Sequence, residues 1–168
     1  MRQQQNTSQS SVNRRRSLSN TPELPVAMFS FMLHFVWEFL QVPTYAGMAE
    51  MAHWQGIKLC TSATIGDVGF ALTAFWTASL VARTRHWIGD QIVLPVLVFL
   101  GTGIALTVGF EFYYTQVTQR WTYSDLMPLV PPFGTGLSPL LQWIVIPPLV
   151  LWLTRRYLAS GAARENCE

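Results

Sequence analysis

The chain has 168 residues, of which 50% are hydrophobic and only 12% are charged. Soluble domains have about a quarter of their residues charged, so this composition excludes an ordinary soluble domain and favours a membrane protein. The net charge of +2 is too small to indicate nucleic acid as a partner, and the length suits one domain.

Residues 1–24 come first and consist mainly of Gln, Ser and Asn, with a cluster of Arg14, Arg15 and Arg16. They contain too little apolar surface to form a core, so they predict a disordered basic N-terminal tail. The polar residues inside the apolar stretch that follows argue against a cleaved signal peptide.

Four apolar stretches follow this tail, each about 17–20 residues long, which is close to the length that a hydrocarbon core requires. They predict membrane-spanning helices at about 26–42, 63–82, 92–110 and 137–153. The predicted fold is therefore all-α, an integral membrane four-helix bundle. The transmembrane domain is expected at 25–157, with a C-terminal tail at 158–168.

The distribution of Lys and Arg predicts the orientation of the spans, because cytoplasmic flanks are enriched in both. Of the 11 such residues, only Lys58 and Arg120 lie in the first and third connections. The other nine lie in the N-terminal tail, the second connection and the C-terminal tail. This bias predicts both termini on the cytoplasmic side of the inner membrane, and it places the long third connection, 111–136, outside.

The two cysteines and the single lysine exclude several kinds of site. Cys60 and Cys167 lack partners at metal-ligand spacing, and the predicted topology puts them on opposite sides of the membrane, so neither zinc nor an internal disulfide is expected. Lys58 lies in a predicted loop, which excludes a Schiff-base lysine inside a span. The sequence indicates no particular cofactor.

Polar side chains inside the spans are predicted to gather near one membrane face. His34, Glu38 and Gln41 are spaced at i, i+4 and i+7, which puts them on one face of a helix. Asp67 is predicted about one turn into the second span, and Glu111 at the end of the third. The topology places His34 near mid-depth and brings the others to the outer-leaflet side. Ionisable groups inside a membrane are costly, normally face the bundle interior and often mark function.

The predicted connections add further side chains to the same layer: His53 from the first, and Trp121, Tyr123 and Asp125 from the third. We therefore predict an outer-leaflet polar pocket. Its candidate catalytic groups are Glu38, Glu111, Asp67 and His34. Its candidate substrate contacts are Gln41, Trp37, Trp121 and Tyr123.

Each of these residues also has a purely structural interpretation. His34 and Glu38 could form an intrahelical pair, Asp67 could cap the start of its helix, and Glu111 could extend toward interfacial water. The tryptophans and tyrosines are typical of interfacial belts. The placement of all the intramembrane acids on one side favours a functional site over these separate explanations.

Close carboxyls in a low dielectric suit proton transfer. That chemistry would serve an enzyme acting on a lipid or a small proton-coupled transporter, which would be a homo-oligomer because four short spans enclose little volume. A third possibility is a non-catalytic subunit of a larger membrane complex. A metal held by His34 and His53 is not favoured, because the two histidines lie on different segments and no HxxxH pair occurs. The expected partners are the lipid bilayer and either further copies of the chain or other membrane subunits.

The segment that begins at Glu111 reads EFYYTQVTQRWTY and is followed by MPLVPPFGTGLSPLLQW. It resembles a stretch of small bacterial multi-pass membrane proteins and is similar to the carotenoid cyclase and hydratase families. Those families have a membrane-embedded Glu, a turn with Trp and Tyr, and a Pro-rich segment before the next helix. The resemblance covers about a fifth of the chain.

The resemblance implies acid-catalysed chemistry on a polyene, with Glu111 as the proton donor and with Trp121 and Tyr123 near the cation that forms. The chain departs from these families in having four predicted spans rather than six or more. It also lacks the paired-Glu motif of the cyclases.

Overall fold

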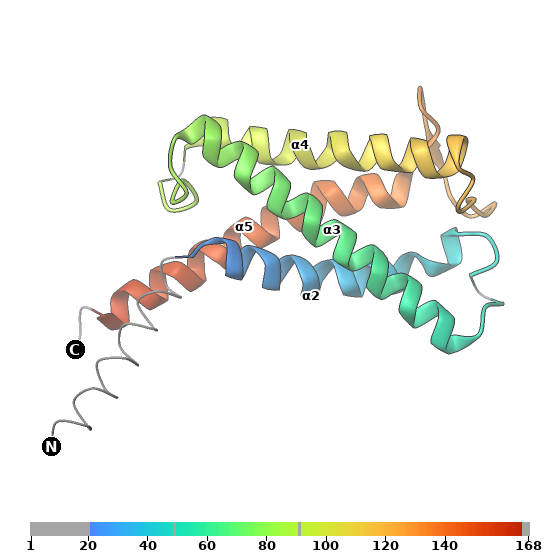
Figure 1. Cartoon of the computed structure of the whole chain (residues 1–168), viewed down its shortest axis with the longest axis horizontal. Helices are drawn as coiled ribbons and strands as arrows, with labels where there is room; N and C mark the ends of the chain where they lie inside the picture. Colours follow the sequence, from blue (N-terminus) through green and yellow to red (C-terminus); the bar gives the residue numbers. More distant parts are fainter. Residues whose placement is uncertain (1–20, 49, 91, 166–168) are drawn as a thin grey trace, which may run out of the picture.

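Four long helices form the protein in the computed structural model, which describes residues 21–48, 50–90 and 92–165 (Figure 1). They are α2 (Glu23–Gln41), α3 (His53–Ala82), α4 (Val93–Phe112) and α5 (Leu137–Glu165). α2 packs against α3 and α5, and α4 packs against the same two helices. All four are long and apolar enough to cross a membrane. The prediction of a mostly helical chain with four candidate spans is thereby confirmed.

Local sequence explains several of the helix ends. Glu23 lies in the first turn of α2, where its negative charge complements the helix dipole. α2 ends at Gln41, and the chain continues directly into a 3₁₀ helical turn that contains Pro43. α3 ends at Ala82, and the C-cap residue that follows, Arg83, has a left-handed φ of 56°. This conformation lets the N–H groups of Arg83 and Thr84 bond to the carbonyls of Leu80 and Ser79.

Two helix boundaries differ clearly from the sequence-based ones. α3 begins at His53, ten residues before the predicted start at 63, and α5 continues to Glu165, twelve residues past the predicted end at 153. Residues 53–62 include Lys58 and several polar side chains, which lower the local hydropathy, but they contain no proline to interrupt the helix. The predicted N-terminal tail lies outside the described residues except for 21–24.

The connections at one end of the bundle are joined to each other. After α2 comes a short 3₁₀ helix, η1 (Val42–Thr44); after α4 come a π-helix, η2 (Tyr113–Val117), and a hairpin of β1 (Leu129–Val130) with β2 (Thr135–Gly136). Tyr45 and Tyr123 form a β-bridge between the two connections. Ala46 N donates to Thr122 O at 2.9 Å beside it.

At the other end of the bundle, the first turn of α2 is joined to the connection between α3 and α4. Arg85 Nε donates to Glu23 Oε1 at 2.7 Å. In Figure 1 the start of α2, this connection and the far end of α5 all lie toward the left.

The apolar core occupies this second end. Trp87, in the connection between α3 and α4, stacks with Phe75 at 5.8 Å and contacts Phe99 at 6.0 Å between ring centroids. Its indole N–H donates to Ser79 Oγ at 3.1 Å. The remaining buried members of the core are Val26, Ala71, Ala74, Ala78, Ile88, Trp143, Ile146 and Val150. The bundle thus has an apolar half, and the buried polar residues with carboxyl groups lie toward the opposite end.

Candidate functional site

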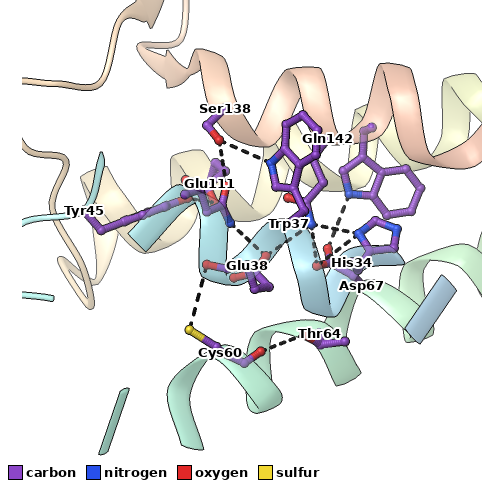
Figure 2. Close-up of polar contacts among 12 residues, drawn as sticks. His34, Trp37, Glu38, Tyr45, Cys60, Thr64, Asp67, Glu111, Ser138 and Gln142 are labelled. Carbon is purple, nitrogen blue, oxygen red and sulfur yellow. Dashed lines mark hydrogen bonds and ion pairs between the residues drawn. The ribbon is translucent and has the colours of Figure 1, made fainter. Parts of the chain in front are cut away.

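The side-chain amide of Gln142, on α5, is the centre of the polar half (Figure 2). Its Nε2 atom lies 2.8 Å from His34 Nδ1, 3.2 Å from Glu38 Oε1 and 3.0 Å from Asp67 Oδ2. All three distances are within hydrogen-bond range. One buried amide therefore joins α2, α3 and α5. We call His34, Glu38, Asp67 and Gln142 the amide centre.

The amide centre has more acceptors than the amide has hydrogens. An amide nitrogen carries two hydrogens, whereas His34, Glu38 and Asp67 offer three acceptor atoms to it. His34 Nδ1 also lies 3.4 Å from Asp67 Oδ2, so a proton on that nitrogen can be donated to Asp67 instead. The two carboxyls lie close to each other, because both accept from the same amide nitrogen. More than one arrangement of the hydrogens is therefore compatible with these distances.

Trp143, the residue after Gln142, holds Asp67 from the other side. Its indole Nε1 donates to Asp67 Oδ1 at 3.4 Å, and its ring lies 5.3 Å from the ring of His34. The indole fits because Gly103 on α4 has no side chain: a Cβ there would lie 2.1 Å from Trp143 Cζ3. Gly103 therefore positions the tryptophan, and the tryptophan positions the acid.

A chain of hydrogen bonds extends the amide centre along the contact between α2 and α5. Gln41 Nε2 donates to Glu38 Oε1 at 2.8 Å, and Ser138 Oγ donates to Gln41 Oε1 at 2.9 Å. Trp37 Nε1 donates to Ser138 Oγ at 3.3 Å. Both predicted substrate contacts on α2, Gln41 and Trp37, are therefore bonded within the protein, next to Glu38.

Glu111 forms a second centre with donors from the two joined connections. Tyr45 donates its hydroxyl to Oε1 at 3.3 Å, and Trp121 Nε1 donates to Oε2 at 3.4 Å. Tyr123 also donates its hydroxyl to Oε2, and that hydroxyl accepts from the backbone N–H of Gly136 at 3.0 Å. We call Glu111 and its three donors the Glu111 centre.

The two tyrosines of the Glu111 centre remain hydrogen-bond donors. Burial, together with the negative charge of Glu111, raises the pKa of Tyr45 and Tyr123 well above the ordinary value of a phenol. Both hydroxyls therefore keep their protons at physiological pH.

The structure brings the predicted site residues together in two groups. His34, Glu38, Asp67 and Gln41 share the amide-centre network, while Glu111 contacts Trp121 and Tyr123. His53 and Asp125 belong to neither group: His53 is the exposed first residue of α3, and Asp125 is exposed in the connection before β1.

Two structural interpretations from the sequence are wrong. Asp67 cannot cap α3, because that helix begins fourteen residues earlier, at His53. It lies near mid-helix rather than one turn in. Glu111 does not extend to water, because it is buried and bonded within the protein.

Sequence reasoning missed Gln142, Ser138, Trp143 and Tyr45. Of these, Gln142 could have been identified from the sequence, because a glutamine in an apolar span must find hydrogen-bond partners. Tyr45 could not be identified, since its role depends on contact between two connections that are far apart in the sequence.

The acidic side chains of the site are not paired with basic side chains in the part of the chain that the structure describes. Across residues 21–48, 50–90 and 92–165, no hydrogen bond or ion pair joins Glu38, Asp67 or Glu111 to a lysine or an arginine. Over the same residues, no group of three His, Cys, Asp or Glu side chains is arranged to hold a metal ion.

No family model, curated protein or solved structure matches this chain.

Proposed function

We propose that this protein performs acid–base chemistry on a lipid or an isoprenoid-like substrate in the membrane. The observation that supports the proposal is the amide centre, where a buried carboxyl, a partly buried carboxyl and an imidazole compete for one amide donor. Such a group of atoms exchanges a proton at small cost, and a positioned acid or base contributes about 10²- to 10⁴-fold to a rate.

In the proposed reaction, the proton shared by Glu38 and Asp67 passes to the substrate, and the pair becomes more negative by one charge. The N–H groups of Gln41 and Gln142 stabilise the carboxylate that remains on Glu38. The pair then takes a proton back from the substrate or from water, so the protein returns to its starting state. Gln142 is a positioning residue in this scheme.

An enzyme agrees better with the bundle than a proton-coupled carrier does. A carrier needs access to its central site from both membrane faces in turn. Beyond the amide centre, the bundle is filled by the apolar core around Phe75, Trp87 and Phe99. This packing favours access to the amide centre from the end that has the joined connections.

The test follows protons into lipids without requiring a known substrate. Membranes with the wild-type protein are incubated in D₂O, lipids are extracted and returned to H₂O, and carbon-bound deuterium or altered species are measured by mass spectrometry. We expect at least one lipid species to change with the wild type. Glu38→Gln should reduce that change about 100-fold or more, because a side-chain amide acts neither as an acid nor as a base near neutral pH.

The matched control is Glu23→Gln, which makes the same change on the same helix but near its opposite end, where Glu23 bonds to Arg85. It should accumulate and react as the wild type does. If Glu38→Gln leaves the lipid profile of the wild type intact at equal accumulation, the acid–base proposal fails. The non-catalytic subunit would then be the better interpretation.

We further propose an inner-membrane location with both termini in the cytoplasm. The nine-to-two distribution of basic residues supports this orientation. Reporter fusions at Arg85 and at the C-terminus should read cytoplasmic, and a fusion after Pro132 should read external. A cytoplasmic signal at Pro132 would reverse the assignment of the joined connections to the outer side.

A further inference from the structure

We propose that the Glu111 centre binds the head group of the substrate, and that this head group is an uncharged hydroxyl rather than a phosphate. The inference rests on the proposed function, because it assigns the substrate class of the same site. Three independent features of the described residues lead to it: the open acceptor position of Glu111, two buried hydroxyls without partners, and the absence of cations.

Glu111 has room for one more donor. A carboxylate offers about four lone-pair positions, two on each oxygen. Oε2 receives Trp121 and Tyr123, whereas Oε1 receives only Tyr45, at 3.3 Å. Among the described residues, one acceptor position on Oε1 therefore has no donor. A ligand that donates a hydrogen bond fits this position.

Two buried hydroxyls on elements that contribute to the Glu111 centre lack hydrogen-bond partners among the described residues. Thr107 is 5% exposed and lies one turn before Glu111 on α4, on the same buried face. Thr135 is 3% exposed and precedes Gly136, whose N–H bonds to Tyr123. The Oγ1 atoms of both threonines are without partners in the described structure, and β2, which contains Thr135, packs against α4.

Of the three head groups compared, a hydroxyl best matches the donors and acceptors that the protein leaves without partners. A hydroxyl donates once and accepts up to twice, so it can donate to Glu111 and accept from a threonine. An ammonium only donates, which leaves the threonine hydroxyls without an acceptor, while a phosphate at neutral pH mainly accepts and faces the negative charge of Glu111. Buried polar groups normally have partners, so a hydroxyl ligand satisfies the set that the protein leaves open.

The charges near the Glu111 centre also disfavour a phosphate. The basic residues at this end of the bundle are Lys58 and Arg120, both exposed. The guanidinium of Arg120 lies over the ring of Tyr114, at 5.3 Å from its centroid. A phosphate head group would therefore meet acids without a bidentate arginine partner, the usual arrangement for phosphate recognition.

Exposed aromatic side chains next to Glu111 offer a contact surface for the apolar chain of the substrate. Phe110 and Phe112 flank Glu111 on α4 and are both exposed. Phe112 also contacts Phe133, in the turn between β1 and β2, at 6.4 Å between ring centroids. A head group at Glu111 would thus place its chain among aromatic side chains on a span, at the lipid boundary.

The experiment measures binding and not turnover. Purified protein in phosphatidylcholine nanodiscs is heated with geranylgeraniol, with geranylgeranylamine or with geranylgeranyl diphosphate, three probes that share one chain. At a concentration 100-fold above Kd, the alcohol should raise Tm by about 5–10 °C. The diphosphate and the amine should raise it much less.

Thr107→Val removes the hydroxyl with little change in shape and should weaken binding of the alcohol about five- to tenfold. The control is Thr73→Val on α3, where the threonine is exposed and bonded to Gly69 O; binding should be unchanged. Each shift is taken relative to the same variant without ligand, so altered stability does not affect the comparison.

Equal or stronger stabilisation by the diphosphate or the amine would overturn the proposal, and so would no stabilisation by any of the three probes. Failure here leaves the acid–base function standing if Glu38→Gln still abolishes the lipid change. Conversely, Glu38→Gln could still change the lipids as the wild type does and still bind the alcohol. That pair of results would exclude the proposed reaction but support the head-group site.

Discussion

Replacing Gln142 by leucine removes the one amide that contacts His34, Glu38 and Asp67, while the side chain keeps nearly the same volume. Because Gln142 is buried, water does not replace the lost donor. Glu38 would keep its bond from Gln41 and Asp67 its bond from Trp143, but both would lose the bond from Gln142. The cost follows from the number of bonds lost.

With one proton shared by the two carboxyls, the amide serves one charged and one neutral acceptor. A hydrogen bond to a charged group contributes about 1.5–3 kcal/mol, and a neutral one about 0.5–1.5 kcal/mol. Gln142→Leu should therefore lower the free energy of unfolding by about 2–4 kcal/mol. This is large compared with most single substitutions, which cost about 0.5–3 kcal/mol.

The assay is reversible unfolding in mixed micelles with increasing SDS, followed by circular dichroism. Gln116→Leu is the matched control, because Gln116 is exposed and its substitution should change stability by less than about 0.5 kcal/mol. Repeating Gln142→Leu in an Asp67→Asn background should give a smaller cost, with a coupling energy of about 1 kcal/mol or more.

Two results would refute this reasoning. The first is a cost below about 1 kcal/mol for Gln142→Leu, which would mean that the acceptors find other donors when the amide is lost. The second is an equal cost with and without the Asp67 carboxyl, which would mean that the bond from Gln142 to Asp67 does not stabilise the bundle.

Two further substitutions test the packing on either side of the amide centre, with the same unfolding assay. Gly103→Ala puts a Cβ 2.1 Å from Trp143 Cζ3, so the indole must move, at a cost of about 1–3 kcal/mol; unchanged stability would show that the ring has free space. Thr154→Val removes a buried hydroxyl without a partner and should be neutral or stabilising by up to about 1 kcal/mol; a clear loss of stability would mean that the hydroxyl has a partner such as water.

The spans could be predicted from the sequence because hydropathy and length are local properties. The same method placed the start of α3 ten residues late, because hydropathy records whether a segment is apolar and not whether it is helical. Residues 53–62 are only partly apolar, yet Cys60 among them is buried. This error moved Asp67 from mid-helix to a helix end, and that position suggested a capping role which the structure contradicts.

The face shared by His34, Glu38 and Gln41 could also be predicted, since three residues at i, i+4 and i+7 fix their own alignment. Their partners could not, because Gln142 lies 101 residues beyond Gln41 and nothing local links the two. An uncharged amide in an apolar span also attracts less attention than an acid does, although it has the same need for partners. Contacts between helices and between connections decide the site, and periodicity contains no information on either.

The division of the bundle into an apolar and a polar half determines how the variants must be compared. In a membrane, close packing and hydrogen bonds hold helices together, because lipid is as apolar as the side chains. Ala71, Ala74 and Ala78 permit close packing around Phe75 in one half, while the amide centre joins three helices in the other. A substitution at Glu38 therefore removes a proton site and also a bond between helices. Loss of activity in Glu38→Gln is evidence for chemistry only if the variant accumulates normally and unfolds as the wild type does.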